Sequence, residues 1–263
     1  MSSLTDAEVS KLAADLYQAR QARIAIPPLT AQYPGLTMTD GYRVQQELVA
    51  TLLAAGERVV GYKLGLTSAP MQQMLGVDSP DFAPVLSSHL HPDGAVVAAA
   101  SFIAPRVEAE IALVLREDLR GPDCTVLDVA AAVSGAVPAL EIVDSRIADW
   151  KISLLDTVAD NASSGGFVVG QAPLRLDQLD LALTGCVFRR NGRVVATGAG
   201  AAVLGSPLHA ATWLANELLG RGAELGPGHV ILTGSITAAI PVGPGDAVTA
   251  TFDHLGSVTA IFD

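Results

Sequence analysis

The pattern of hydrophobic and polar positions predicts a chain that begins with helices. Thr5 is followed three residues later by Glu8, the arrangement of a capping box, and this predicts a helix to about Gln21. Thr39 opens a second helical pattern, in which leucine and valine recur at helical spacing until Gly56. The segment between the two helices contains Pro-Pro and Pro-Gly pairs, so we expect loops there.

Strands are predicted from residue 58 onward. Apolar runs over 58–67, 106–115 and 138–143 are typical of strands, and the Asn-Gly pair within 187–195 favours a hairpin. Pro207 starts a further predicted helix to about residue 219. We therefore expect an α+β fold that forms a single structural unit. An N-terminal helical section over 1–58 would pack on a β-rich domain over 59–263, which would carry any site.

Two glutamates one residue apart interrupt the apolar run over 106–115. Because side chains alternate along a strand, Glu108 and Glu110 point to one face and the apolar residues between and beyond them to the other. Two like charges on a half-buried strand repel each other and lose hydration, and a divalent cation would remove both penalties. The alternative is a solvent-facing strand, on which the pair costs little.

A third carboxylate, Glu141, lies in the apolar stretch over 138–143. Three carboxylates with no nearby cysteine or histidine suit a hard cation such as Mg²⁺ or Mn²⁺ better than Zn²⁺. Such an ion keeps coordination positions that an oxygen-rich substrate can fill. Asp144 follows Glu141, and we interpret it as pairing with Arg146.

Further candidates for chemistry lie in three other segments. Lys63 is surrounded by small and apolar residues, so burial is expected to lower its pKa toward a range useful for acid–base catalysis, unless it lies at a strand edge. Asp81 lies in a predicted loop rich in turn formers, where turn capping is the simpler interpretation. Ser163 and Ser164 belong to a polar cluster that either presents hydroxyls to a substrate carboxylate or is an ordinary loop.

Composition limits the partners of the chain. Its 263 residues include 16 basic and 27 acidic side chains, a formal net charge of -11, which argues against nucleic-acid and anionic membrane partners. An anionic small substrate stays compatible, because a bound metal reverses the local field. The two cysteines have no metal-like spacing, the N-terminus lacks a secretory pattern and no apolar run approaches a membrane span. We therefore expect a cytoplasmic protein.

Several motifs together resemble one family. They lie at 61–68, 75–81, 105–110 and 144–151, followed by 160–164 and a closing pattern over 230–235, 244–246 and 255–258. In this order they resemble the 2-keto-4-pentenoate hydratases, also called 2-hydroxypenta-2,4-dienoate hydratases, and the related 4-oxalocrotonate decarboxylases. Both groups belong to the fumarylacetoacetate hydrolase superfamily, and the resemblance covers nearly the whole chain.

The resemblance implies a fold, a cofactor and a set of site residues. It implies a β-rich, roll-like core around a Mg²⁺ or Mn²⁺ site, a homo-oligomer, and a small 2-keto acid substrate from the meta-cleavage degradation of aromatics. By motif match, the metal ligands would be Glu108, Glu110 and Glu141, the acid–base groups Lys63 and Asp81, and the residues near the substrate carboxylate Ser163 and Ser164. The histidine-containing dyad of the hydrolase branch has no recognisable counterpart, which disfavours acylpyruvate hydrolysis.

The hydratase and the decarboxylase share a dienolate intermediate, so the far end of the substrate must separate them. A decarboxylase accepts a second carboxylate at C6, which needs a basic partner. The basic residues near the motifs are few, Arg106, Arg146 and Lys151, and the last two lie among aspartates. We therefore expect hydration of 2-hydroxypenta-2,4-dienoate to 4-hydroxy-2-oxopentanoate, with 4-oxalocrotonate (2-oxo-3-hexenedioate) decarboxylation as the alternative. A non-catalytic partner subunit, associated with a pathway enzyme, is the second alternative.

Overall fold

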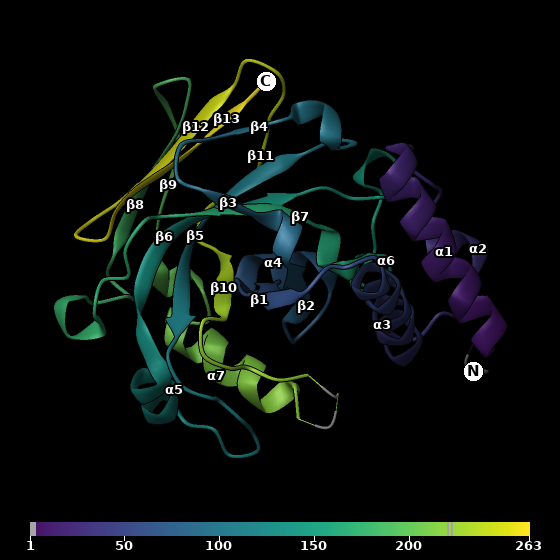
Figure 1. Ribbon diagram of the computed structural model, residues 1–263, viewed down its shortest axis with the longest axis horizontal. Helices are drawn as coiled ribbons and strands as arrows, with labels where there is room; N and C mark the ends of the chain where they lie inside the picture. The colour runs from purple at the N-terminus through teal and green to yellow at the C-terminus, as the bar shows by residue number, and fades with distance from the viewer. Residues whose placement is uncertain (1–3, 220, 222) are drawn as a thin grey trace.

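Two β-sheets and a group of N-terminal helices form the molecule (Figure 1). The structure is a computed structural model that describes residues 4–263 except 220 and 222. The larger sheet has eight strands in the order β2-β1-β10-β5-β6-β7-β3, with β11 paired to β5. Its strands are β1 (Val59–Gly65), β2 (Asp81–Leu86), β3 (Leu90–Pro92), β5 (Arg106–Leu115), β6 (Val133–Val143), β7 (Ser164–Val169), β10 (Val230–Ser235) and β11 (Ile240–Pro241).

The smaller sheet has five strands in the order β4-β13-β12-β8-β9. These strands are β4 (Ala95–Val97), β8 (Gly185–Arg190), β9 (Arg193–Ala199), β12 (Ala247–Phe252) and β13 (Gly256–Phe262). The hairpin between β8 and β9 is confirmed, and its turn residues Asn191 and Gly192 have φ of 52° and 76°, as a type I′ turn requires. An apolar core of buried side chains from both sheets and from α7 joins them.

The helices lie mainly outside the sheets. They are α1 (Asp6–Ala22), α2 (Leu29–Gln32), α3 (Met38–Ala54), α4 (Ala69–Leu75), α5 (Val126–Ala132), α6 (Leu154–Ala159) and α7 (Pro207–Glu217). Six short 3₁₀ turns are η1 (Ser87–His89), η2 (Ala99–Ser101), η3 (Ala148–Trp150), η4 (Asn161–Ser163), η5 (Leu176–Gln178) and η6 (Gly200–Ala202). Within the described residues, no helix is long and apolar enough to cross a membrane.

The N-terminal helices begin at capping boxes. The box formed by Thr5 and Glu8 is confirmed. The second helix starts earlier than predicted, because Thr37 caps it and Asp40 completes the box, so Thr39 already lies within the first turn. Figure 1 shows α1, α2, α3 and α6 grouped on one side of the larger sheet. Their shared core includes Leu86 and Ile147, so the helical section packs directly on the rest of the chain.

The larger sheet curls so that its two ends approach each other. Strand β2 lies at one edge, and the turn η4, which leads into β7 near the other edge, packs against β2. The side-chain amide of Asn161 in η4 donates to the carbonyl oxygen of Pro84 in β2 at 3.2 Å. This closure creates an enclosed inner face on the sheet, consistent with the expected α+β fold.

Candidate active site

The strand register places the five candidate acid and lysine side chains on this inner face. Glu108 on β5 lies opposite Glu141 on β6, and Glu110 shares their face because it is two residues from Glu108. On the other side, Lys63 on β1 pairs with Leu232 on β10, and Leu232 pairs with Ala112 on β5. Directly paired residues share a face, so the inner face carries Lys63 together with the three glutamates.

The three glutamates converge. Each offers one carboxylate oxygen, and these oxygens all lie within 4.8 Å of one another. Glu110 and Glu141 are fully buried, whereas Glu108 is half-buried at the open end of the row. One Glu110 oxygen accepts the N–H of Gly234 at 2.8 Å. Its other oxygen and both oxygens of Glu141 accept no hydrogen bond from the described residues, although a buried acceptor normally has a donor.

Burial makes this cluster hard to ionise. It raises the pKa of Glu108 to about 7, with repulsion from Glu141 as the next cause. The pKa of Glu110 is well above its usual range, because burial is reinforced by both neighbouring carboxylates. Burial also raises the pKa of Glu141, although the lysine beside it opposes the shift. A divalent cation would relieve this repulsion and supply the missing partners.

Lys63 is fully enclosed by acceptors. Its Nζ donates to the carbonyl oxygen of Ala162 at 2.9 Å and forms an ion pair with Glu141 at 3.2 Å. Burial alone would lower the pKa of Lys63, but the carboxylates of Glu141 and Asp81 outweigh burial and raise it. The prediction of a lowered pKa is therefore wrong, because the sequence could not reveal how many carboxylates surround the amine.

Asp81 is the first residue of β2 and lies opposite Gly65 of β1, so the prediction of a loop is wrong here. Its side chain is 1% exposed, and among the described residues neither carboxylate oxygen has a hydrogen-bond partner. Burial raises its pKa. A Cβ on Gly65 would lie 2.1 Å from the Asp81 carboxylate, so glycine is needed for the carboxylate to reach this position.

The turn η4 supplies the carbonyl that holds Lys63. Its three residues, Asn161 to Ser163, all have φ between 47° and 54°, the left-handed region that non-glycine residues seldom adopt. All three are buried. The Oδ1 of Asn161 and the hydroxyl of Ser163 have no partner among the described residues, whereas the hydroxyl of Ser164 lies 3.4 Å from His89 Nδ1. The polar cluster is therefore an ordered, enclosed turn.

Arg146 forms hydrogen bonds to residues on both sides of this turn. Its Nε pairs with the Asp160 carboxylate at 2.5 Å, and its guanidinium also donates to the carbonyl oxygens of Asp144, Asp160 and Ser164. The Asp144 carboxylate instead accepts N–H groups from Ile103 and Ala104. The predicted pairing of the Asp144 carboxylate with Arg146 is therefore wrong. Asp144 is nearer to Arg146 in the sequence and was therefore favoured as its partner, but folding brings the carboxylate of Asp160 to the guanidinium.

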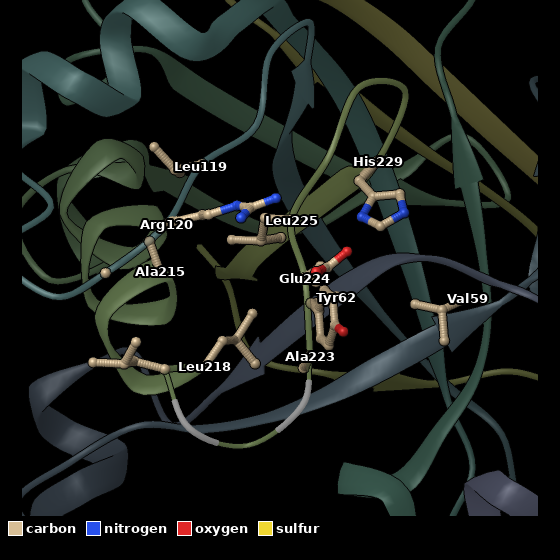
Figure 2. A pocket seen from close by; sticks show the side chains of 12 residues that line it. Val59, Tyr62, Leu119, Arg120, Ala215, Leu218, Ala223, Glu224, Leu225 and His229 are labelled. Carbon is tan, nitrogen blue, oxygen red and sulfur yellow. The ribbon is translucent and has the colours of Figure 1, made fainter.

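A cavity of about 510 Å³ lies elsewhere, beside the start of β1 (Figure 2). Tyr62, Glu224 and His229 line one side of it, and Leu119 and Leu218 lie across from them. Although Tyr62 precedes Lys63, it points to the opposite face of β1. None of the candidate side chains lines this cavity, so we place the candidate site at the enclosed carboxylates.

Comparisons with known proteins agree with this fold. The family described as fumarylacetoacetate (FAA) hydrolase C-terminal matches residues 62–262. A 2-keto-4-pentenoate hydratase of Burkholderia vietnamiensis is 44% identical, over 98% of both chains. A 4-oxalocrotonate decarboxylase of Pseudomonas sp. strain CF600 is 42% identical, over 99% of this chain and 98% of the other.

The structural comparison gives the same result. The 4-oxalocrotonate decarboxylase from Pseudomonas putida G7, complexed with magnesium and adipate, superposes with a TM-score of 0.95 at 41% identity, covering 99% of each chain. The predicted resemblance and the α+β fold with N-terminal helices are thereby confirmed. The chain belongs to the fumarylacetoacetate hydrolase family.

Proposed function

We propose that the protein is a metal-dependent hydratase that adds water to 2-hydroxypenta-2,4-dienoate and forms 4-hydroxy-2-oxopentanoate. One observation carries the proposal: Glu108, Glu110 and Glu141 converge on the inner face of the sheet that also carries Lys63. Relatives with 2-keto-4-pentenoate hydratase in their names, 43–44% identical to this chain, support the same reaction.

The carboxylate cluster fits a Mg²⁺ or Mn²⁺ ion. The donors are all oxygens, and their spacing allows one ion to reach all three. One Glu110 oxygen and both Glu141 oxygens accept no hydrogen bond from the described residues, although Lys63 forms an ion pair with Glu141. We assign Glu108, Glu110 and Glu141 as its ligands. When bound, the ion would act as a Lewis acid toward the carboxylate and keto oxygens of a 2-keto acid. A magnesium-containing relative at 41% identity supports this choice of ion.

We assign Lys63 and Asp81 as the acid–base pair. Because the pKa of Lys63 is raised, the amine stays protonated and can donate, and the Ala162 carbonyl fixes its direction. Because the pKa of Asp81 is raised, its carboxylate is a stronger base than an exposed aspartate. The dienol loses its 2-hydroxyl proton and gains a proton at C5. Asp81 then takes a proton from the water that attacks C4, and Lys63 donates a proton to C3.

We assign Ser163 and Ser164 to the substrate carboxylate. Among the described residues, the Ser163 hydroxyl has no hydrogen-bond partner, which suits a donor to the substrate carboxylate. Ser164 contacts His89 through its hydroxyl, so it would act chiefly through its backbone. We further propose a cytoplasmic homo-oligomer, with no nucleic-acid partner, that can associate with a pathway enzyme.

Decarboxylation of 2-oxo-3-hexenedioate is the second candidate, because decarboxylases at 41–42% identity match as much of the chain. The basic side chains that could bind the C6 carboxylate are engaged elsewhere. Arg146 is paired with Asp160, Lys151 is exposed and paired with Asp149, and Arg106 lies 4.4 Å over the Trp150 ring. This arrangement favours the shorter, uncharged tail of the pentadienoate.

Parallel assays separate the two reactions. Purified protein with Mg²⁺ is assayed on each substrate separately. Hydration of 2-hydroxypenta-2,4-dienoate is measured by the loss of its ultraviolet absorbance, and decarboxylation of 2-oxo-3-hexenedioate is measured by the release of CO₂. The proposal predicts a higher kcat/KM for hydration. A higher kcat/KM for decarboxylation would make the protein a decarboxylase with the same site. Inactivity on both substrates with a fully loaded metal site would favour a non-catalytic partner subunit.

A further inference from the structure

A second cavity, of about 300 Å³, lies outside the carboxylate site. It is enclosed by the end of α1, the segment from η1 to β3, the segment from β4 to η2 and the start of β7. Its lining includes Arg20, His89 and His91 on the polar side, and Val97, Ala98 and Phe102 on the apolar side. Its volume is at the lower end of the range for small-molecule pockets, roughly 300–1,000 Å³.

Arg20 brings a positive charge to this cavity, whose lining also includes the Asp144 carboxylate and the Arg146 guanidinium. The Arg20 guanidinium is half-buried and donates to Nε2 of His89 at 2.6 Å. Arg20 forms no ion pair with a carboxylate of the described residues, and Glu57, Asp160 and Asp144 act on it only through longer-range attraction. His89 cannot serve as a counterion, because an imidazole is either neutral or cationic, and burial and the neighbouring Arg20 lower its pKa to about 3 and keep it neutral.

The acids nearest to Arg20 are already committed to other partners. Asp160 holds Arg146, Asp144 accepts the N–H groups of Ile103 and Ala104, and Glu57 accepts from the Ser87 hydroxyl. The end of α1 supplies only the partial negative charge of a helix C-terminus. A buried cation without a direct partner is costly, and an anion in the cavity would remove that cost.

We propose that this cavity binds a small organic monocarboxylate, with the carboxylate on Arg20 and the hydrocarbon part on Val97 and Phe102. The free N–H groups of the guanidinium suit two carboxylate oxygens, and the half-buried His91 and the exposed Ser101 can add donors at the rim. Arg146 also lines the cavity, but its guanidinium is held by Asp160, so Arg20 is the cation available to a ligand, and its combination with an apolar wall selects a carboxylate on an apolar body over inorganic phosphate. The inference does not depend on the proposed enzymatic function.

Binding of benzoate to the full chain tests the proposal. The protein is treated with EDTA, so that a carboxylate cannot bind through a metal, and is titrated calorimetrically with benzoate and with neutral benzamide. We expect saturable 1:1 binding of benzoate and at least ~10-fold weaker binding of benzamide, from the loss of a charge-assisted hydrogen bond. Arg20→Gln should weaken benzoate binding by a similar factor, whereas Arg23→Gln, a change at an exposed arginine of the same helix end, should leave it unchanged.

A second variant tests the proposal independently, in case Arg20→Gln fails to fold. Ala98 is exposed and lines the cavity, so Ala98→Phe should fill the cavity and abolish binding while the thermal unfolding midpoint stays close to that of the wild type. Equal affinity for benzoate and benzamide, or unchanged benzoate binding in both variants, would overturn the proposal. The proposal would also be overturned if the wild type did not bind benzoate and Arg20→Gln changed the oligomeric state. The counterion of Arg20 would then come from a second copy of the chain.

Discussion

Removal of the Arg146 guanidinium should destabilise the fold and disturb Lys63 together. In Arg146→Met, the Asp160 carboxylate loses its partner while staying fully buried, and the carbonyls of Asp144, Asp160 and Ser164 lose their donor. The left-handed turn between those carbonyls would no longer be held at both ends. Since that turn carries the Ala162 carbonyl, the position of Lys63 should loosen as well.

The size of the effect follows from the burial of the pair. Breaking a buried ion pair by removing one partner costs roughly 3–5 kcal/mol. For a chain of this size, each kcal/mol lowers the melting temperature by about 2–4 °C, so we expect a decrease of roughly 6–20 °C. Burial already raises the pKa of Asp160 to about 6 despite Arg146, so the carboxyl in the variant should become protonated near neutral pH and recover part of the loss.

Urea denaturation of Arg146→Met, Asp160→Asn and the double variant measures the coupling. The double variant should be more stable than Arg146→Met, because it leaves no unpaired buried charge. Arg175→Met is a matched control, because Arg175 forms a comparable pair with Asp177 on the exposed surface, and it should cost at most ~1 kcal/mol. A cost for Arg146→Met no larger than that of the control would refute the assigned role of the buried pair.

Three further predictions concern the site itself. Lys63→Met and Asp81→Asn should each lower kcat by ~10² to 10⁴-fold. The Mn²⁺ affinity of both variants, measured by electron paramagnetic resonance, should stay within a few-fold of the wild type. Near-normal turnover would show that these residues are structural. Arg106→Gln, at the half-buried start of β5, should change kcat/KM for 2-oxo-3-hexenedioate and for 2-hydroxypenta-2,4-dienoate by similar factors, because Arg106 already lies over the Trp150 ring, and a loss confined to the dicarboxylate would show that Arg106 binds the C6 carboxylate. In the metal-free protein, the pKa values of Glu108 and Glu110 are raised, so above about pH 4.5 the native state binds more protons than the unfolded state. The free energy of unfolding of the metal-free protein should therefore fall as pH rises toward about 7. Stabilisation by Mg²⁺ should therefore be larger at pH 8 than at pH 5, and calorimetric melting with the reverse trend would contradict the raised pKa values.

Local patterns in the sequence were sufficient where a few neighbouring residues decide the structure. The capping box at Thr5 and the turn at Asn191 depend on contacts within a few positions, and both are confirmed. The face shared by Glu108 and Glu110 follows from alternation along one strand. That β6 lies beside this strand, with Glu141 directly opposite Glu108, depends on sheet order, which periodicity could not give. The family resemblance implied only that the three glutamates bind one metal.

Long-range electrostatics could not be predicted in the same way. The direction of the Lys63 pKa shift depends on how many carboxylates fold around the amine, and the partner of Arg146 depends on a turn 14 residues away. The burial of Asp81 had no local signal, and the left-handed turn at Asn161 had only a general one, because aspartate and asparagine are also common in exposed turns. An unusual run of small polar residues before a buried strand was the available hint.

The position of the metal tests the account most directly. Crystals of the protein grown with Mn²⁺ allow an anomalous difference map, which locates the ion independently of any assumed ligands. The account predicts a single strong peak with oxygens of Glu108, Glu110 and Glu141 at roughly 2.0–2.6 Å, lost in Glu141→Gln. A strong peak elsewhere, or none at the three carboxylates in Mn²⁺-saturated crystals, would contradict the metal site and the hydratase mechanism built on it.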